Sequence, residues 1–206
     1  MFRKARIEAL SDAVIAIAMT LLVLDLKAPP AGVPGGLGHA LLQDSHEWIS
    51  FVVSFGLASV FWSMQHRVFD QIEELDTVSL ILSFAFLGLV TVLPFTTAVW
   101  GRHISDPIAH TVYFCNQFLI AATLLLKMER ARVKGQLRAG IESESLRLRL
   151  MFMCLLMGSA MVATQLVQIN HVWWFLVPLA LIARYMRYLQ NKRAAALAKV
   201  SPPELP

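Results

Sequence analysis

Charged side chains are scarce in this chain, with Asp, Glu, Lys and Arg at only 16% of its 206 positions. Hydrophobic residues make up 57% of the sequence, and the mean hydropathy is +0.60. A soluble domain of this length cannot hide so much apolar surface, so the composition is typical of an integral membrane protein. The net charge of +4 does not indicate nucleic-acid binding, because basic residues gather at helix ends on one side of a membrane.

Cysteine is also rare, and several familiar motifs are missing. Cys115 and Cys154 both lie in apolar stretches, so we interpret them as small buried hydrophobes and not as a disulfide framework or zinc ligands. The sequence has no Thr-Val-Gly-Tyr-Gly filter, Walker loop, His-Glu-x-x-His or Gly-x-Ser-x-Gly, and no arginine-rich voltage-sensing segment. We therefore predict no catalytic residue, no cofactor and no enzymatic activity.

What the chain does have is six apolar segments long enough to cross a bilayer. Helices are the expected structure, because lipid cannot satisfy backbone polar groups and the segments are too long for barrel strands. We predict an all-α integral membrane protein in which residues 1–192 form one six-helix domain, followed by a polar tail at residues 193–206. The predicted transmembrane helices are residues 6–26, 47–66, 77–99, 107–126, 148–169 and 172–188.

Lys and Arg residues lie mainly on one side of this six-helix arrangement. They are Arg3, Lys4 and Arg6 before the first segment, Lys127, Arg130, Arg132, Lys134, Arg138, Arg147 and Arg149 between the fourth and fifth, and Arg184, Arg187, Lys192 and Arg193 after the sixth. The positive-inside rule then predicts that both termini are cytoplasmic. An interfacial belt at the predicted outer ends is expected from Trp48, Trp100, Trp173 and Trp174, whereas Trp62 does not fit this belt.

The first segment is unusual because it carries a carboxylate near each end, Asp12 and Asp25. The uncharged run between them spans about 18 Å as a helix, against a hydrocarbon core of about 30 Å. Ionisable groups at such a depth usually face a bundle interior or a water path. Asp12 should find its partner on another helix, with Trp62 and His66 as candidates; a charge that simply snorkels to the boundary is the alternative.

Helical spacing places Ala13, Ile17, Thr20 and Leu24 on one stripe of this segment, with Leu21 beside it. The residues alone leave two interpretations open, ordinary packing within a bundle or an apolar wall with a special role. The hydroxyl of Thr20 is expected to donate back to the carbonyl of Ala16 if the stripe is only structural.

The sequence from Arg6 to Asp12, Arg-Ile-Glu-Ala-Leu-Ser-Asp, and the apolar run that ends in Thr-Leu-Leu-Val-Leu resemble the first-helix signature of the transmembrane protein 175 family. The family pattern is Arg-x-x-x-Phe-Ser-Asp followed by a similar apolar run. Further likeness lies in Phe61-Trp62, His66 and Phe69, and in Leu93-Pro94-Phe95-Thr96. Leu10 replaces the family's Phe, an apolar exchange that weakens a packing contact more than it threatens the resemblance.

This family comprises endolysosomal potassium channels and their prokaryotic homologues, and the single six-helix repeat resembles the prokaryotic form. The resemblance implies a homotetrameric potassium channel of modest selectivity in a prokaryotic plasma membrane, without a re-entrant pore loop. Helix 1 of each subunit would line the pore, with Ile17, Leu21 and Leu24 as a hydrophobic gate and Thr20 as a filter residue. Permeant K⁺ would pass near Ile17 and Thr20.

Arg6, Ser11 and Asp12 match the motif that braces helix 1, with Trp62 and His66 as helix 2 partners.

Other functions remain open at this stage. A secondary transporter or a proton-permeable pathway would use Asp12 and His66, although internal repeats and broken helices are not evident. A membrane scaffold that transports nothing is a further alternative. The expected partners are potassium ions, membrane lipid and further copies of the chain, and not nucleic acid.

Overall fold

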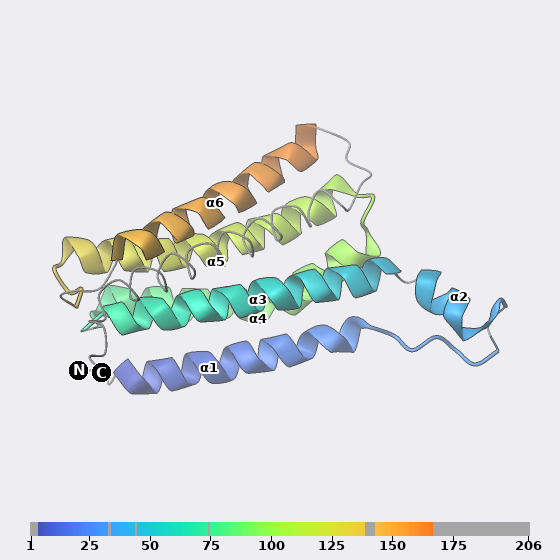
Figure 1. Cartoon of the computed structure of the whole chain (residues 1–206), viewed down its shortest axis with the longest axis horizontal. Helices are drawn as coiled ribbons and strands as arrows, with labels where there is room; N and C mark the ends of the chain where they lie inside the picture. The colour runs from blue at the N-terminus through green and yellow to red at the C-terminus, as the bar shows by residue number, and fades with distance from the viewer. Residues whose placement is uncertain (1–3, 33, 44, 74, 139–142, 167–206) are drawn as a thin grey trace, which may run out of the picture. The chain divides into compact units, whose positions relative to one another are not determined.

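The computed structural model describes residues 4–166, except residues 33, 44, 74 and 139–142. Five long helices run through this part of the chain, and each is long and apolar enough to cross a membrane (Figure 1). They are α1 (Lys4–Leu21, continued by the 3-10 turn η1, Leu22–Asp25), α3 (Ser45–Gln71), α4 (Thr77–Arg102), α5 (Pro107–Val133) and α6 (Ser143–Leu166), with a short α2 (Gly36–Gln43) before α3. The predicted sixth helix, the tail, Trp173 and Trp174 lie outside the described residues.

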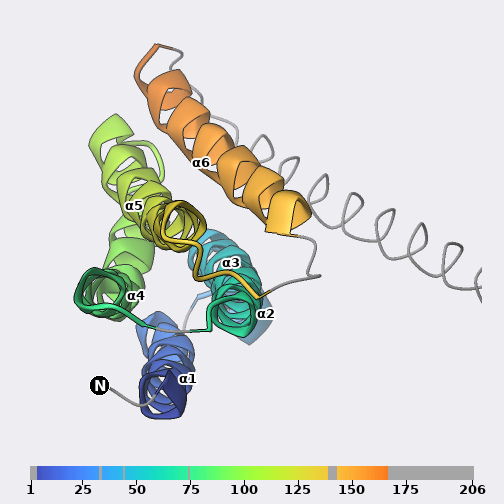
Figure 2. The ribbon, with the colours of Figure 1, turned by 90° about the vertical axis from the view of Figure 1, so that its left-hand side faces the viewer.

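Successive long helices run in opposite directions, so the described bundle has two ends. The start of α1 and the end of α3 lie at one end, which we call the Lys4 end; η1 and the start of α3 lie at the other, the Asp25 end. Viewed along the bundle, α1 sits at its margin beside α3 and α4, whereas α6 lies against α5 on the opposite side (Figure 2). Within the described residues, α1 therefore packs on one side only.

The helices are longer than the predicted apolar segments, because charged side chains in their terminal turns bond to residues of neighbouring helices. Lys127, expected in a polar connection, instead lies inside α5 and is fully buried. Its ammonium donates to Ser83 Oγ at 2.9 Å and lies 3.4 Å from the centre of the Phe69 ring. The expected end of this helix near residue 126 is therefore wrong.

Asp76 joins two helices at the Lys4 end. Its carboxylate caps α4 by accepting from the backbone N–H of Ser79 at 2.8 Å, and it also accepts from Arg130 Nε at 2.9 Å. These hydrogen bonds hold the pKa of Asp76 well below its usual range, and the bond from the Arg130 guanidinium has the largest effect. The carboxylate is therefore ionised at neutral pH and ties the start of α4 to the end of α5.

Polar side chains also pack in the middle of the bundle, where the apolar pattern gave no sign of them. Ser54 on α3 shares a 2.9 Å hydrogen bond with the buried Tyr113 hydroxyl on α5, and Thr97 on α4 donates to Ser54 Oγ at 2.9 Å.

Trp100, expected in an interfacial belt, is completely buried and stacks on Tyr113 with ring centres 4.5 Å apart. That expectation is wrong because the indole fills the space between α4 and α5.

Gly101 allows a close approach of α4 to α3. A Cβ atom at this position would lie 2.4 Å from Ser50 Oγ and 3.2 Å from Ser50 Cβ. The first distance is shorter than real Cβ contacts and the second is tight, so Ser50 or the helix would have to shift to admit an extra methyl group. The glycine is thus required by the packing of two helices and not by a turn.

We expect Gly101→Ala to lower the melting temperature of the detergent-purified protein, because overpacking costs about 1–3 kcal/mol. Gly88→Ala on the same helix is the control: a Cβ there meets no atom within 4 Å, and alanine favours a helix over glycine by about 1 kcal/mol. Adding Ser50→Ala should recover part of the loss. Equal melting temperatures for the Gly101→Ala and Gly88→Ala variants would contradict this account of the packing.

Candidate functional site: the first helix

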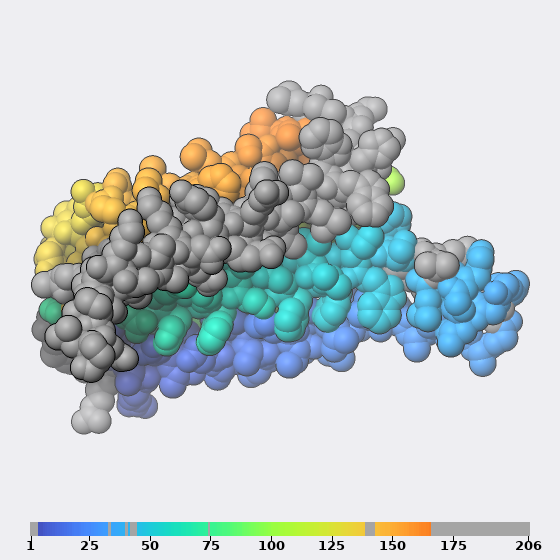
Figure 3. Space-filling view, in the orientation of Figure 1, coloured from blue at the N-terminus to red at the C-terminus, as the bar shows by residue number. Residues whose placement is uncertain are grey.

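One face of α1 is buried in the bundle and another is open. Ile15, Ala18 and Leu22 are buried against α3 and α4, with Leu22 in a cluster that includes Ala58 and Leu93. The predicted stripe occupies the open face, where Ile17 is 58% exposed and Leu24 71% exposed. Figure 3 shows α1 along one edge of the molecule, next to α3.

The open face continues through the other members of the stripe. Ala13 and Thr20 are exposed, and Leu21 is 39% exposed. A row of uncharged side chains that is exposed among the described residues is available to lipid or to further copies of the chain. Among the described residues, the stripe therefore does not pack inside the bundle; it faces either lipid or another copy.

Thr20 lies just before the point where α1 tightens into the 3-10 turn η1. Its hydroxyl donates to the carbonyl oxygen of Ile17 at 2.7 Å, not to Ala16 as expected. The hydroxyl oxygen keeps a lone pair directed away from this bond. Thr20 can therefore still offer an oxygen at the open face, beside Ile17 and Leu21.

The Arg6, Ser11 and Asp12 motif lies at the Lys4 end of α1, and its members play different parts. Ser11 is buried and donates to the carbonyl oxygen of Ile7 at 2.8 Å. Asp12 accepts a 2.9 Å hydrogen bond from the indole Nε1 of Trp62 on α3. Arg6 is exposed and forms no ion pair within the described part of the chain. Of these three residues, Asp12 is thus the one that bonds to α3, through Trp62.

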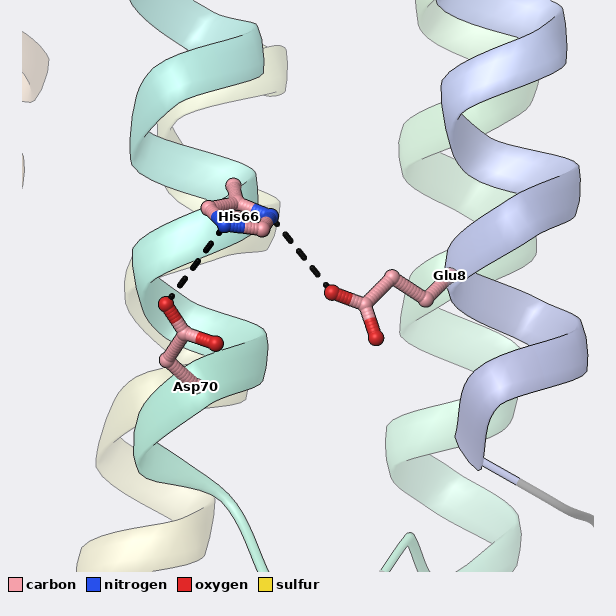
Figure 4. A group of neighbouring side chains, drawn as sticks. All are labelled: Glu8, His66 and Asp70. Atoms are coloured by element: carbon pink, nitrogen blue, oxygen red, sulfur yellow. Dashed lines mark ion pairs between the residues drawn. The ribbon is translucent and has the colours of Figure 1, made fainter.

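His66, the other expected partner of Asp12, contacts two different carboxylates (Figure 4). Its Nδ1 lies 3.4 Å from Glu8 Oε1 on α1, and its Nε2 lies 3.6 Å from Asp70 Oδ2, one turn further along α3. The imidazole also stacks on Trp62, with ring centres 6.1 Å apart. Trp62 and His66 therefore face α1 side by side, with Trp62 bonded to Asp12 and His66 paired with Glu8 and Asp70.

The opposite end of α1 is held by a contact that sequence reasoning missed. Arg102, at the end of α4, lies 3.3 Å from Asp25 Oδ1 in η1, and its Nε lies 3.9 Å from Glu47 Oε1 on α3. The sequence does contain a signal, because Arg102 follows the third predicted segment and so falls at the same end of the bundle as Asp25, near the end of the first. The helix is thus connected by a carboxylate to its neighbours at each end, with the open apolar face between.

Comparison with known proteins identifies the family. Residues 6–94 match the sequence model of the endosomal/lysosomal potassium channel TMEM175. A crystal structure of a lysosomal potassium-selective channel TMEM175 homolog from Chamaesiphon minutus superimposes with a TM-score of 0.77 at 27% identity, covering 91% of this chain and 98% of that one. The chain is a homologue of the TMEM175 family. The family is one of channels, so the prediction that the protein is not an enzyme is confirmed.

Curated relatives of this TMEM175 homologue carry two different names. A potassium channel of Streptomyces collinus is 34% identical over 129 residues, which are 63% of each chain. An endosomal/lysosomal proton channel TMEM175 of Rattus norvegicus is 30% identical over 142 residues, covering 60% of this chain and 28% of that one. This chain thus spans less than two thirds of either relative. With five long apolar helices in the part that the structure describes, it is a multi-pass membrane protein.

Proposed function

We propose that this TMEM175 homologue is a cation channel with modest selectivity for K⁺. The observation that carries the proposal is the open apolar face of α1, which holds Ile17, Leu21 and Leu24 and is not used for packing within the described bundle. The potassium channel name of the Streptomyces relative supports the choice of ion. In this proposal the open face of α1 meets the same face of further copies, and the path for ions lies between them.

Four copies around one axis would turn each residue of this face into a ring. Rings of Ile17, Leu21 and Leu24 form a narrow apolar constriction, which closes by excluding water. A ring of Thr20 oxygens would replace part of the water shell of a passing cation. K⁺ loses its water more easily than Na⁺, and a sparse set of ligands therefore favours K⁺ only modestly.

The proposal has further parts, which concern the brace of α1, the membrane and the ion. Asp12 and Trp62 brace α1 against α3 so that the open face keeps its direction toward the axis. The protein acts in the plasma membrane of a prokaryote as a homotetramer surrounded by lipid, with the Lys4 end in the cytoplasm. K⁺ is the permeating ion, and no cofactor takes part.

The test is a flux measurement on purified protein in liposomes, together with its mass in mild detergent. We expect a K⁺ gradient to drive flux that rises with the gradient without saturation, and native mass spectrometry to find four copies of the 23.0 kDa chain. Empty liposomes are the control. A monomer at concentrations where flux occurs would contradict the assembly, and saturable uptake would favour a transporter.

The proton-channel name of the rat relative makes proton permeation the second candidate. A pH-sensitive dye inside the same liposomes separates the two. Acidification in the absence of K⁺ movement would favour a proton pathway, whereas K⁺ flux without a matching dye response supports the proposal.

A further inference from the structure

The side chains of Glu8, His66 and Asp70 meet at the Lys4 end, outside the apolar face described above. Glu8 comes from α1, whereas His66 and Asp70 come from successive turns of α3 (Figure 4). One possible ligand atom from each, a ring nitrogen and two carboxylate oxygens, lies within 4.8 Å of the others. The three side chains are 28%, 50% and 58% exposed, so an ion can reach them from solution.

The spacing is close to what a metal ion requires. Ligands at about 2.0–2.2 Å from a tetrahedral ion lie roughly 3.3–3.6 Å from one another. The observed separations, 3.4 Å from Glu8 Oε1 to Nδ1 and 3.6 Å from Asp70 Oδ2 to Nε2, are of this size, but each involves a different ring nitrogen. A metal binds only one ring nitrogen, so one flexible carboxylate must swing across the edge of the imidazole.

The types of ligand restrict which ion would bind. A neutral imidazole with two carboxylates suits first-row divalent ions such as Zn²⁺ and Co²⁺, whereas Ca²⁺ and Mg²⁺ prefer oxygen ligands only. Two carboxylates also balance the charge of a divalent cation. Asp12, which bonds to Trp62, is not among the ligands.

We propose that Glu8, His66 and Asp70 form a binding site for a divalent transition-metal ion that bridges α1 and α3. His66 and Asp70 supply two ligands four residues apart on one helix, and Glu8 supplies the third from the other helix. Water completes the coordination on the exposed side. The ion would join the start of α1 to α3 one turn below the Asp12–Trp62 hydrogen bond.

The experiment is a Co²⁺ titration of the full chain in detergent, with any affinity tag removed, followed by visible absorption and then by Zn²⁺ displacement. We expect one Co²⁺ per chain and a band that Zn²⁺ abolishes. Glu8→Gln, His66→Gln and Asp70→Asn should each weaken binding at least about tenfold, since even groups that only support a ligand affect affinity by that much. His103→Gln is the control, because His103 is an exposed histidine at the Asp25 end.

The variants also separate a lost ligand from a lost fold. Asp70 is the most exposed of the three, so Asp70→Asn should keep the wild-type melting temperature while it loses Co²⁺. Absence of saturable Co²⁺ binding to the wild-type protein, or equal binding by all variants, would overturn the proposal. If Glu8→Gln binds Co²⁺ like the wild type while the other two variants do not, the proposal that the ion bridges α1 and α3 is wrong. None of these measurements depends on ion flux. The Co²⁺ titration therefore tests the metal site even if the proposed channel function is wrong.

Discussion

Ile17→Asn should increase cation flux through the reconstituted protein and reduce its preference for K⁺ over Na⁺. Ile17 lies in the middle of the open face of α1, with 58% of its side chain exposed within the subunit. In the proposed tetramer four Ile17 side chains surround the path of the ion, and they cannot replace its water shell. The amide groups of four asparagines can. A barrier lower by about 1 kcal/mol corresponds to roughly fivefold faster passage.

The measurement is the conductance and reversal potential under a K⁺–Na⁺ bi-ionic gradient. Leu155→Asn is the matched control, because Leu155 is 71% exposed on α6, on the far side of the bundle from α1. The control variant should keep the wild-type reversal potential. If Ile17→Asn also keeps wild-type conductance and reversal potential, this face of α1 does not line the pore and the proposed mechanism fails.

The course of the helices could be predicted from sequence because lipid imposes one simple condition, a long apolar run for each crossing. Five of the predicted segments coincide with long helices in the described part of the chain. Their ends were wrong where charged residues extend the helix. Lys127 illustrates the reason, since its ammonium is satisfied by Ser83 and the Phe69 ring, and neither residue is near it in sequence.

The candidate site could be predicted only in part. The depth of Asp12 in its apolar segment predicted a partner on another helix, and α3 offered two donors, Trp62 and His66. Choosing Trp62 over His66 required the actual rotation of α3 against α1. The contacts of Arg102 with Asp25 and of His66 with Glu8 join positions far apart in the chain. Helical periodicity describes one helix at a time, so it contains no information about such pairs.

Asp12 gives the second large expected effect, because its carboxylate is the acceptor for Trp62 Nε1 at 2.9 Å. Asp12→Ala removes this acceptor, and a hydrogen bond to a charged group contributes about 1.5–3 kcal/mol. We expect a lower melting temperature and dissociation of the assembly at lower detergent concentration. The ratio of K⁺ to Na⁺ permeability in the remaining channels should not change, since Asp12 points to α3 and not along the apolar stripe.

A double-mutant cycle with Trp62→Phe separates the hydrogen bond from other effects of the lost charge. If the bond is what matters, Asp12→Ala combined with Trp62→Phe should be scarcely less stable than either single variant, because each change removes the same interaction. Additive losses would mean that Asp12 and Trp62 act through different neighbours. Normal assembly of Asp12→Ala with an altered reversal potential would instead make Asp12 a ligand for the permeating ion, and its proposed role as a brace for α1 would be wrong.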